Sequence, residues 1–205
     1  MTTLTWPTFI RATPRALDWS LVANTQTFSS PLSGSVQTIE LPGAKWKASF
    51  QLENLTEVDA ATFQAFLVQL RGKAGRFALF NFARSEPRGT QRGSPQVKGA
   101  SQIGTTLAID GCTAAATLLA GDYFSVNGEL KMVVADATAD GSGNMTLTFE
   151  PPLRSSPADN APLTLVQPTA TFMLLSDESK WNTQPGRFST FPIDAIEAVI
   201  VRTRQ

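Results

Sequence analysis

The sequence predicts a mainly β protein with one packed α-helix and a small β-barrel inserted into a discontinuous domain. Three observations support this fold class. Short alternating runs are separated by Gly- and Pro-containing turns, a single stretch has helical spacing, and the two ends of the chain resemble each other more than the middle. With 205 residues, of which 42% are hydrophobic, the chain is long enough to bury a core in one or two domains.

The N-terminal third divides into an irregular part and a patterned part. Before Val36 the chain is rich in Thr, Ser and Pro, so we expect extended chain with little regular structure. The patterned runs 36–41 and 45–52 follow, with the turn residues Pro42-Gly43 between them. Apolar side chains share one side of the second run, at Trp46, Ala48, Phe50 and Leu52. These features predict a β-hairpin with one buried face.

Residues 56–71 are predicted to form the helix. Thr56 is a suitable N-cap, and the acidic Glu57 and Asp59 favour the positive end of the helix dipole. Apolar residues recur at helical spacing, at Phe63, Phe66, Leu67 and Leu70, and Gly72 ends the pattern. We expect this stripe to lie against one face of a sheet.

The middle of the chain predicts short strands joined by turns. An aromatic strand at 76–82 is followed by a Gly- and Pro-punctuated loop at 83–102. Short strands are then expected at 105–109, 123–126, 129–134, 145–149 and 163–166. Asn127-Gly128 is the strongest hairpin signal, because both central residues of a type I′ turn need positive φ. Residues 140–143 predict a second, longer turn.

Longer strands return at 170–175 and 195–201, after the last of these turns. They resemble the first third of the chain more than the middle. We therefore predict a discontinuous domain formed by residues 1–91 and 167–205, into which residues 92–166 are inserted as a small β-barrel.

Composition excludes several classes of function. Lys and Arg balance Asp and Glu at 17 each, so the chain lacks the cationic field that nucleic-acid and anionic-membrane binding generally use. Histidine is absent and Cys112 is the one cysteine, which removes imidazole catalysis, internal disulfides and cysteine metal clusters. No apolar run reaches the length of a membrane span. We expect a soluble protein made in a cytoplasm, with neither nucleic acid nor membrane as its partner.

The neutral total conceals an uneven distribution of charge. Residues 1–109 have a net charge of +5, residues 110–159 a net charge of −5, and residues 160–205 a net charge of zero. Unlike charges on two parts of one subunit suit head-to-tail contact between copies. The alternative is that these charges belong to separate solvated surfaces.

Candidate catalytic and metal-binding patterns are weak. Asp136, Thr138 and Asp140 follow the start of a calcium loop, but Leu147 stands where a bidentate Glu is needed. Acidic residues that could form a glycosidase pair all lie in turns or alternating strands, at Asp110, Asp122, Glu129, Asp136 and Glu150. We therefore expect no catalytic, metal or cofactor site, and a protein that is not an enzyme.

Several short phrases occur in order along nearly the whole chain: Asn24-Thr25, Ser30-Pro31-Leu32-Ser33-Gly34, Pro42-Gly43 with Trp46, residues 70–77, Pro87-Arg88-Gly89-Thr90, residues 119–123, and Pro151-Pro152-Leu153-Arg154. Together they resemble the distal tail proteins and related tail-tip proteins of long-tailed, siphovirus-type bacteriophages. None of these phrases is a catalytic signature.

The resemblance implies a structural subunit of the virion, located in the phage tail. Such a subunit forms a ring, commonly of six copies, that joins the tail-tube protein to the tail-tip hub protein. It also implies that the N-terminal part is a split β-barrel with one packed helix. The inserted position of the second domain departs from family members that carry it at the C-terminus.

Two functions remain open at this stage, a ring-forming structural protein and a receptor- or carbohydrate-binding module of the tail. For the first, we expect the assembly interface to use charged residues from both parts of the chain, namely Arg71, Lys73, Arg76, Arg88, Arg92, Asp122 and Asp136. For the second, the inserted barrel offers three aromatic residues, Tyr123, Phe124 and Phe149.

Overall fold

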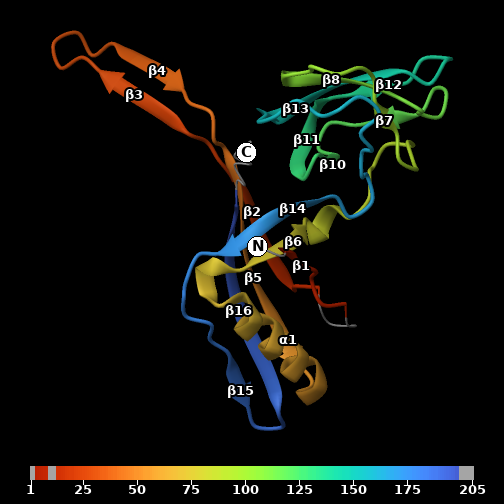
Figure 1. Cartoon of the computed structure of the whole chain (residues 1–205). Helices are drawn as coiled ribbons and strands as arrows, with labels where there is room; N and C mark the ends of the chain where they lie inside the picture. Colours follow the sequence, from red (N-terminus) through yellow and green to blue (C-terminus); the bar gives the residue numbers. More distant parts are fainter. Residues whose placement is uncertain (1–2, 9–12, 199–205) are drawn as a thin grey trace, which may run out of the picture.

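The computed structural model describes residues 3–8 and 13–198. A seven-stranded sheet carries the helix α1, a smaller barrel lies beside one end of this sheet, and a two-stranded hairpin projects away from it (Figure 1). The expectation of a mainly β fold with one packed α-helix is confirmed.

The large sheet curls into a half-barrel. Its strands, in spatial order, are β1 (Thr3–Leu4), β6 (Arg76–Phe80), β14 (Thr169–Leu174), β16 (Phe188–Glu197), β5 (Lys45–Leu55) and β2 (Ala16–Val22). The short strand β15 (Asn182–Gln184) pairs with the start of β16. Because neighbouring strands come from both ends of the sequence, the sheet forms only when these ends meet.

Helix α1 (Glu57–Leu70) covers one face of this sheet. Thr56 is the N-cap, and its Oγ1 accepts a hydrogen bond from the Asp59 N–H over 3.4 Å. Arg71 ends the helix in the left-handed conformation, and the 3₁₀ turns η1 (Gly72–Ala74) and η2 (Phe82–Arg84) flank β6. The buried side of the helix contains the four residues predicted by the spacing, Phe63, Phe66, Leu67 and Leu70, together with Ala60.

The core between helix and sheet is aromatic. Trp6 lies at its centre, with its ring centroid 5.4 to 5.9 Å from those of five phenylalanines: Phe50, Phe63, Phe66, Phe77 and Phe82. Most of these pairs meet edge to face, the arrangement that aromatic rings prefer. These six aromatic residues come from the first 82 positions, and Phe172 and Phe191 of the C-terminal strands belong to the same cluster.

The N-terminal segment contains more regular structure than its composition suggests. Strands β2 and β3 (Thr25–Ser29) lie before Val36, so the expectation of little regular structure there is wrong. In β2, the half-buried Leu17 and Trp19 pack on the core, while Asp18 between them and Ala16 and Ser20 on either side are exposed. Alternation of this kind is typical of a strand, but the prediction for this segment was based on its Ser, Thr and Pro content instead.

The hairpin predicted between 36–41 and 45–52 is also wrong. Strand β4 (Val36–Glu40) pairs with β3, and the Gly34 N–H closes their turn by donating to the Ser30 carbonyl over 2.9 Å. Pro42 lies at the base of this hairpin, where its carbonyl accepts a hydrogen bond from Asn24 Nδ2 over 3.0 Å. We call β3, β4 and their turn, residues 25–40, the arm.

A second sheet forms the small barrel. Its strands, in order, are β10 (Tyr123–Val126), β11 (Glu129–Ala135), β13 (Met145–Leu153), β8 (Gly104–Asp110) and β7 (Gln96–Val97), with β9 (Thr117–Leu118) and β12 (Ala137–Thr138) paired beside it. Residues 161–164 close it. The Ala161 carbonyl accepts from the Val97 N–H on one edge, and Thr164 exchanges two backbone hydrogen bonds with Ser125 on the other.

Two local predictions in this barrel have clear outcomes. Asn127 and Gly128 both have positive φ, +52° and +77°, and join β10 to β11, so the hairpin prediction is confirmed. The strand expected at 163–166 is reduced to an isolated bridge at Thr164, because these residues bond to strand edges on two sides.

In the large sheet, the strand expected at 195–201 begins earlier, as β16, and positions 199–201 lie outside the described residues.

Two hydrophobic clusters correspond roughly to the two sheets. The second cluster runs from Val97 to Leu165, within the predicted insertion, whereas the first contains the aromatic core. Tyr123 and Leu130 of the small barrel belong to the first cluster. The division into two domains stays a prediction, and these two residues show that the cores are in contact.

Candidate functional site

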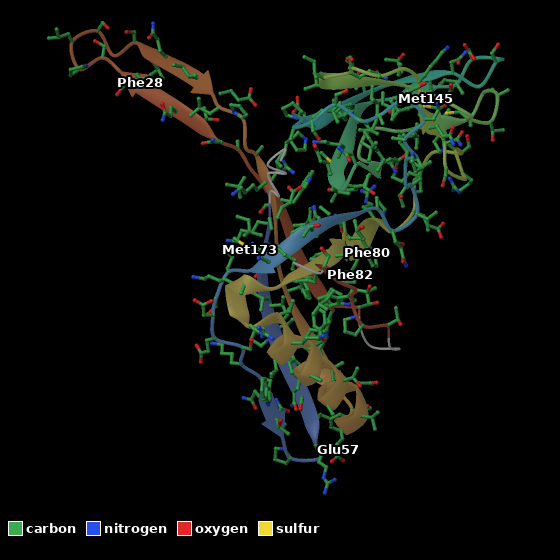
Figure 2. All side chains as sticks on the ribbon, viewed as in Figure 1. Phe28, Glu57, Phe80, Phe82, Met145 and Met173 are labelled. Atoms are coloured by element: carbon green, nitrogen blue, oxygen red, sulfur yellow. The ribbon has the colours of Figure 1, made fainter. Side chains whose placement is uncertain are left out.

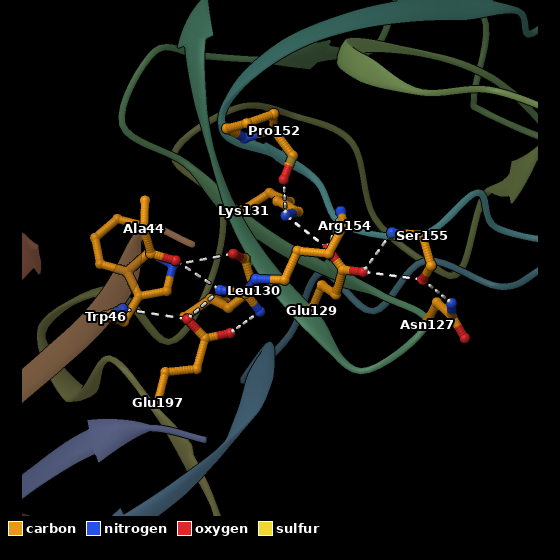
Figure 3. Close-up of polar contacts among 10 residues, drawn as sticks. All are labelled: Ala44, Trp46, Asn127, Glu129, Leu130, Lys131, Pro152, Arg154, Ser155 and Glu197. Atoms are coloured by element: carbon orange, nitrogen blue, oxygen red, sulfur yellow. Dashed lines mark hydrogen bonds and ion pairs between the residues drawn. The ribbon is translucent and has the colours of Figure 1, made fainter. Parts of the chain in front are cut away.

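The surface where the two sheets meet is built around Trp46. Its indole Nε1 donates to the Leu130 carbonyl over 2.9 Å (Figure 3). The Trp46 ring also meets the Tyr123 ring edge to face, with the centroids 5.5 Å apart. Trp46 is 2% exposed. The large sheet therefore presents a buried aromatic side chain to the β10–β11 hairpin, which anchors the barrel on the sheet.

An ion pair crosses the same junction. Arg154, directly after β13, donates to both carboxylate oxygens of Glu197 in β16, over 2.6 and 2.7 Å, and to the Ala44 carbonyl over 2.9 Å. Glu197 is 1% exposed and also accepts from the Trp46 backbone N–H over 3.1 Å. Burial alone would lower the pKa of Arg154, but its hydrogen bonds to Glu197 raise that pKa above its ordinary value. The pair stays charged and links the barrel to the last described strand of the sheet.

A second buried pair lies within the barrel, next to the first. Lys131 is fully buried, and its Nζ lies 2.8 Å from Glu129 Oε2 and donates to the Pro152 carbonyl over 2.8 Å. Glu129 also accepts from the backbone N–H groups of Arg154 and Ser155, over 3.0 and 3.2 Å. Burial lowers the pKa of the Lys131 ammonium, while Glu129 counteracts that shift.

This network has a structural role that follows from its contacts. The carboxylate of Glu129 orients the backbone at Arg154, and Arg154 in turn reaches Glu197 across the junction (Figure 3). Removing one partner of a buried ion pair leaves the other charge unpaired and is strongly destabilising, so the Arg154–Glu197 pair stabilises the contact between the two sheets. None of the described residues forms a group of three or more His, Cys, Asp or Glu side chains that could hold a metal ion.

The chain that enters the barrel is held by Asp122. This carboxylate is 2% exposed and accepts from the backbone N–H groups of Arg88, Gly89 and Leu119, over 2.7, 3.0 and 2.8 Å. A Cβ atom at Gly89 would lie 2.1 Å from the Thr117 carbonyl oxygen, so only glycine fits this crossing. The Asp122 carboxylate is therefore buried and holds the backbone of its own chain, and its role in an assembly interface stays a prediction.

Three of the predicted interface arginines bind the chain's own carbonyl groups. Arg76 donates to the carbonyls of Lys73, Ala74 and Gly75, over 2.8, 3.1 and 2.8 Å. Arg92 donates to two carbonyls and Arg88 to one, that of Ala120 at 3.4 Å. These side chains shape loops, and Arg88 and Arg92 remain exposed.

The remaining predicted interface residues lie on the surface in different places. Arg71 and Lys73 are exposed at the end of α1, and Asp136 is exposed next to β12 of the barrel, where it accepts from the Ala120 N–H over 2.8 Å. The structure thus does not gather the seven charged residues into one site. Their role in contacts between copies stays a prediction.

Two exposed apolar surfaces were not predicted. All ten strand residues of the arm are exposed, including Phe28 at 55% and Ile39 at 50%. The outward side of α1 exposes Val58 at 75% and Val68 at 63%. For the helix, the sequence does contain a pattern that indicates this exposed surface, because apolar residues recur at helical spacing on two sides of the helix rather than on one.

None of the helices in the described part of the chain is both long and apolar enough to cross a membrane. Comparison with known proteins leaves the family open: no protein-family model matches this chain, and no curated protein sequence matches it.

Proposed function

We propose that this protein is a structural subunit of a bacteriophage tail tip, which forms a ring that joins the tail tube to the tail-tip hub. The observation that carries this proposal is the arm. Two-stranded hairpins are at best marginally stable alone in water, and this one projects from the body with every strand residue exposed. Such an element gains its stability from contact with another chain.

The phrases that resemble distal tail proteins lie at the base and tip of the arm, at the entrance to the barrel and at the junction of the two sheets. Asn24 and Pro42 bond to each other at the base of the arm, and Ser30–Gly34 form its tip. Arg88 and Gly89 bind Asp122 at the entrance to the barrel, and Pro152 and Arg154 belong to the junction. The resemblance therefore follows features of architecture, which supports a shared structural role.

The alternative, a receptor- or carbohydrate-binding module, finds less support. Sugar binding generally uses exposed aromatic rings, but Tyr123, Phe124 and Phe149 are 8%, 0% and 0% exposed. Phe124 and Phe149 pack against each other in the barrel core, with ring centroids 5.4 Å apart. The barrel is better suited to act as a rigid spacer whose orientation is fixed by the junction.

The test is the assembly state of the purified protein. Light scattering and electron microscopy should show closed rings of the protein under one of two conditions. The protein is studied by itself at high concentration, and it is studied after mixing with purified tail tubes, whose ends the rings should cap. Glycan binding by the purified protein, without self-association under either condition, would favour the alternative. A protein that neither self-associates nor binds tail tubes would contradict the proposed ring.

A further inference from the structure

The arm presents one face with no charge. The strand register places Gln26, Phe28, Gln37 and Ile39 on the same side of the ribbon. Phe28 and Ile39 lie diagonally across this face, and both are half exposed. Glu40, at the base, is the one charged residue among positions 25–40. An exposed ribbon without lysine or a protective charge near its tip is suited to pairing with another surface rather than to remaining in water.

The outward face of α1 has the same character. Val58, Ala61, Ala65 and Val68 follow one another at spacings of three or four, so they form one stripe along the helix. All four are exposed. No charged residue occurs between Ala60 and Leu70, although exposed faces of surface helices are ordinarily charged. The helix therefore has two apolar sides, of which its own sheet covers one.

These two surfaces cannot meet within one molecule. The arm projects from one end of the large sheet and α1 lies toward the other, as Figure 2 shows by the positions of Phe28 and Glu57. They match in extent: the stripe from Val58 to Val68 is about 15 Å long at 1.5 Å per residue, and a five-residue strand of the arm is about 17 Å long. They also match in charge, since both are neutral.

We infer that the arm of one copy docks on the outward face of α1 of the next copy. Two complementary patches at separate places on one molecule produce a head-to-tail contact, which repeats from copy to copy and closes into a ring when the rotation permits. The inference rests on the proposed function, because it names the contact that joins the subunits of that ring. In this contact the copies meet through uncharged surfaces, and not through attraction between the positively and negatively charged parts of the chain, as the charge distribution had led us to expect.

The contact can be tested by disulfide cross-linking. In a Cys112→Ser background, which removes the one native thiol, Ile39→Cys is combined with Ala65→Cys in the same chain. Oxidation should give a ladder of dimers, trimers and larger species on a denaturing gel. A mixture of the two single-cysteine proteins should stop at dimers, since each copy then has only one reactive end. A matched control pairs Ile39→Cys with Thr146→Cys, an exposed position on the barrel, and should give no ladder.

A charge substitution provides the second readout. Val68→Lys places an ammonium on the stripe, and because Val68 is exposed, the fold should be unaffected. Self-association measured by light scattering should weaken by about tenfold, equivalent to about 1.4 kcal/mol. Thr146→Lys adds the same charge elsewhere and should leave self-association unchanged.

The outcomes separate this contact from the ring itself. Rings that form without an Ile39–Ala65 ladder would overturn the contact and leave the proposed function standing. Cross-linking of the Ile39→Cys protein with itself would show arm-to-arm pairing and would also overturn it. A protein that stays monomeric with and without tail tubes would contradict both proposals.

Discussion

The arm and the β10–β11 pair are both antiparallel β-hairpins, yet their surroundings are opposite: β11 also pairs with β13 in the barrel sheet, whereas the arm is a separate two-stranded sheet. Every strand residue of the arm is exposed, whereas β10 is buried along its whole length. One face of the β10–β11 hairpin contributes Tyr123 and Leu130 to the aromatic core, and the other contributes Phe124 and Val126 to the barrel core. One hairpin is completed by its own chain, and we propose that a second copy completes the other.

The difference teaches that local turn chemistry and burial are separate sources of information. Gly34 in the arm and Asn127-Gly128 in the barrel each supply the positive φ that closes their turn. Neither turn determines what the ribbon packs against. Packing is determined by which other segments reach the ribbon, and for the arm no segment among the described residues does so.

The largest expected effect comes from truncating the aromatic side chain of the buried hairpin. Phe124→Ala removes a ring that is fully buried against Phe149, so the free energy of unfolding should fall by about 3–5 kcal/mol. The matched change in the arm, Phe28→Ala, should lower it by about 0.5 kcal/mol or less in the monomer. Urea unfolding at low protein concentration measures both. Similar losses for the two variants would break the comparison.

A smaller effect is expected at the junction that holds the buried hairpin. Arg154→Met removes the cation from Glu197, which is 1% exposed, and should lower the free energy of unfolding by about 2 kcal/mol. The same substitution at Arg15, which pairs with Glu53 at 3.5 Å on the surface, should change it by less than about 1 kcal/mol. Adding Glu197→Gln to Arg154→Met should recover part of the loss, because it removes the unpaired charge. Equal effects at the two arginines would show that the junction is not a fixed contact.

The third expected effect is a pH dependence of the free energy of unfolding that arises from Lys131 in the β10–β11 hairpin. Because burial lowers the pKa of Lys131, the folded protein releases this proton before the unfolded chain does. Stability should therefore rise with pH, relative to Lys131→Met, between the lowered pKa and about 10.4, by about 1.4 kcal/mol for each unit of lowering. The raised pKa of Tyr123, caused by burial, affects both proteins and cancels. Urea unfolding from about pH 8 to 11 measures the difference, and a difference that falls with pH would contradict the assignment.

Local signals in the sequence predicted the helix and the Asn127-Gly128 hairpin. Thr56 and the apolar spacing that follows determine α1 within a few neighbouring turns, so no distant partner is needed. The contact between Trp46 and Leu130 spans 84 positions and that between Trp46 and Glu197 spans 151, so no local pattern indicates them. Lys131 illustrates the limit, since it lies in an alternating strand and is nevertheless fully buried.

The assembly surface could not be predicted from charge either, because the sequence does not show which charged side chains are already bound within the molecule. Counting charges along the chain treats each Asp and Arg as free, but Asp122 and Arg76 bind backbone groups within their own molecule. The uncharged stretches were less conspicuous in the sequence, because an exposed Val58 and a buried Phe63 are both apolar. Only the direction in which each side chain points distinguishes an outward stripe from a core stripe.

The two-faced β10–β11 hairpin has a consequence for how the subunit unfolds. If the barrel leaves the sheet, Trp46 and Leu130 lose their shared hydrogen bond, and if the hairpin melts, both clusters lose part of their lining. The two cores are thereby coupled into one cooperative unit, which should unfold in a single transition rather than domain by domain. A subunit with damage in either core is then lost as a whole. In the proposed ring, half-folded copies that would block closure should therefore not accumulate.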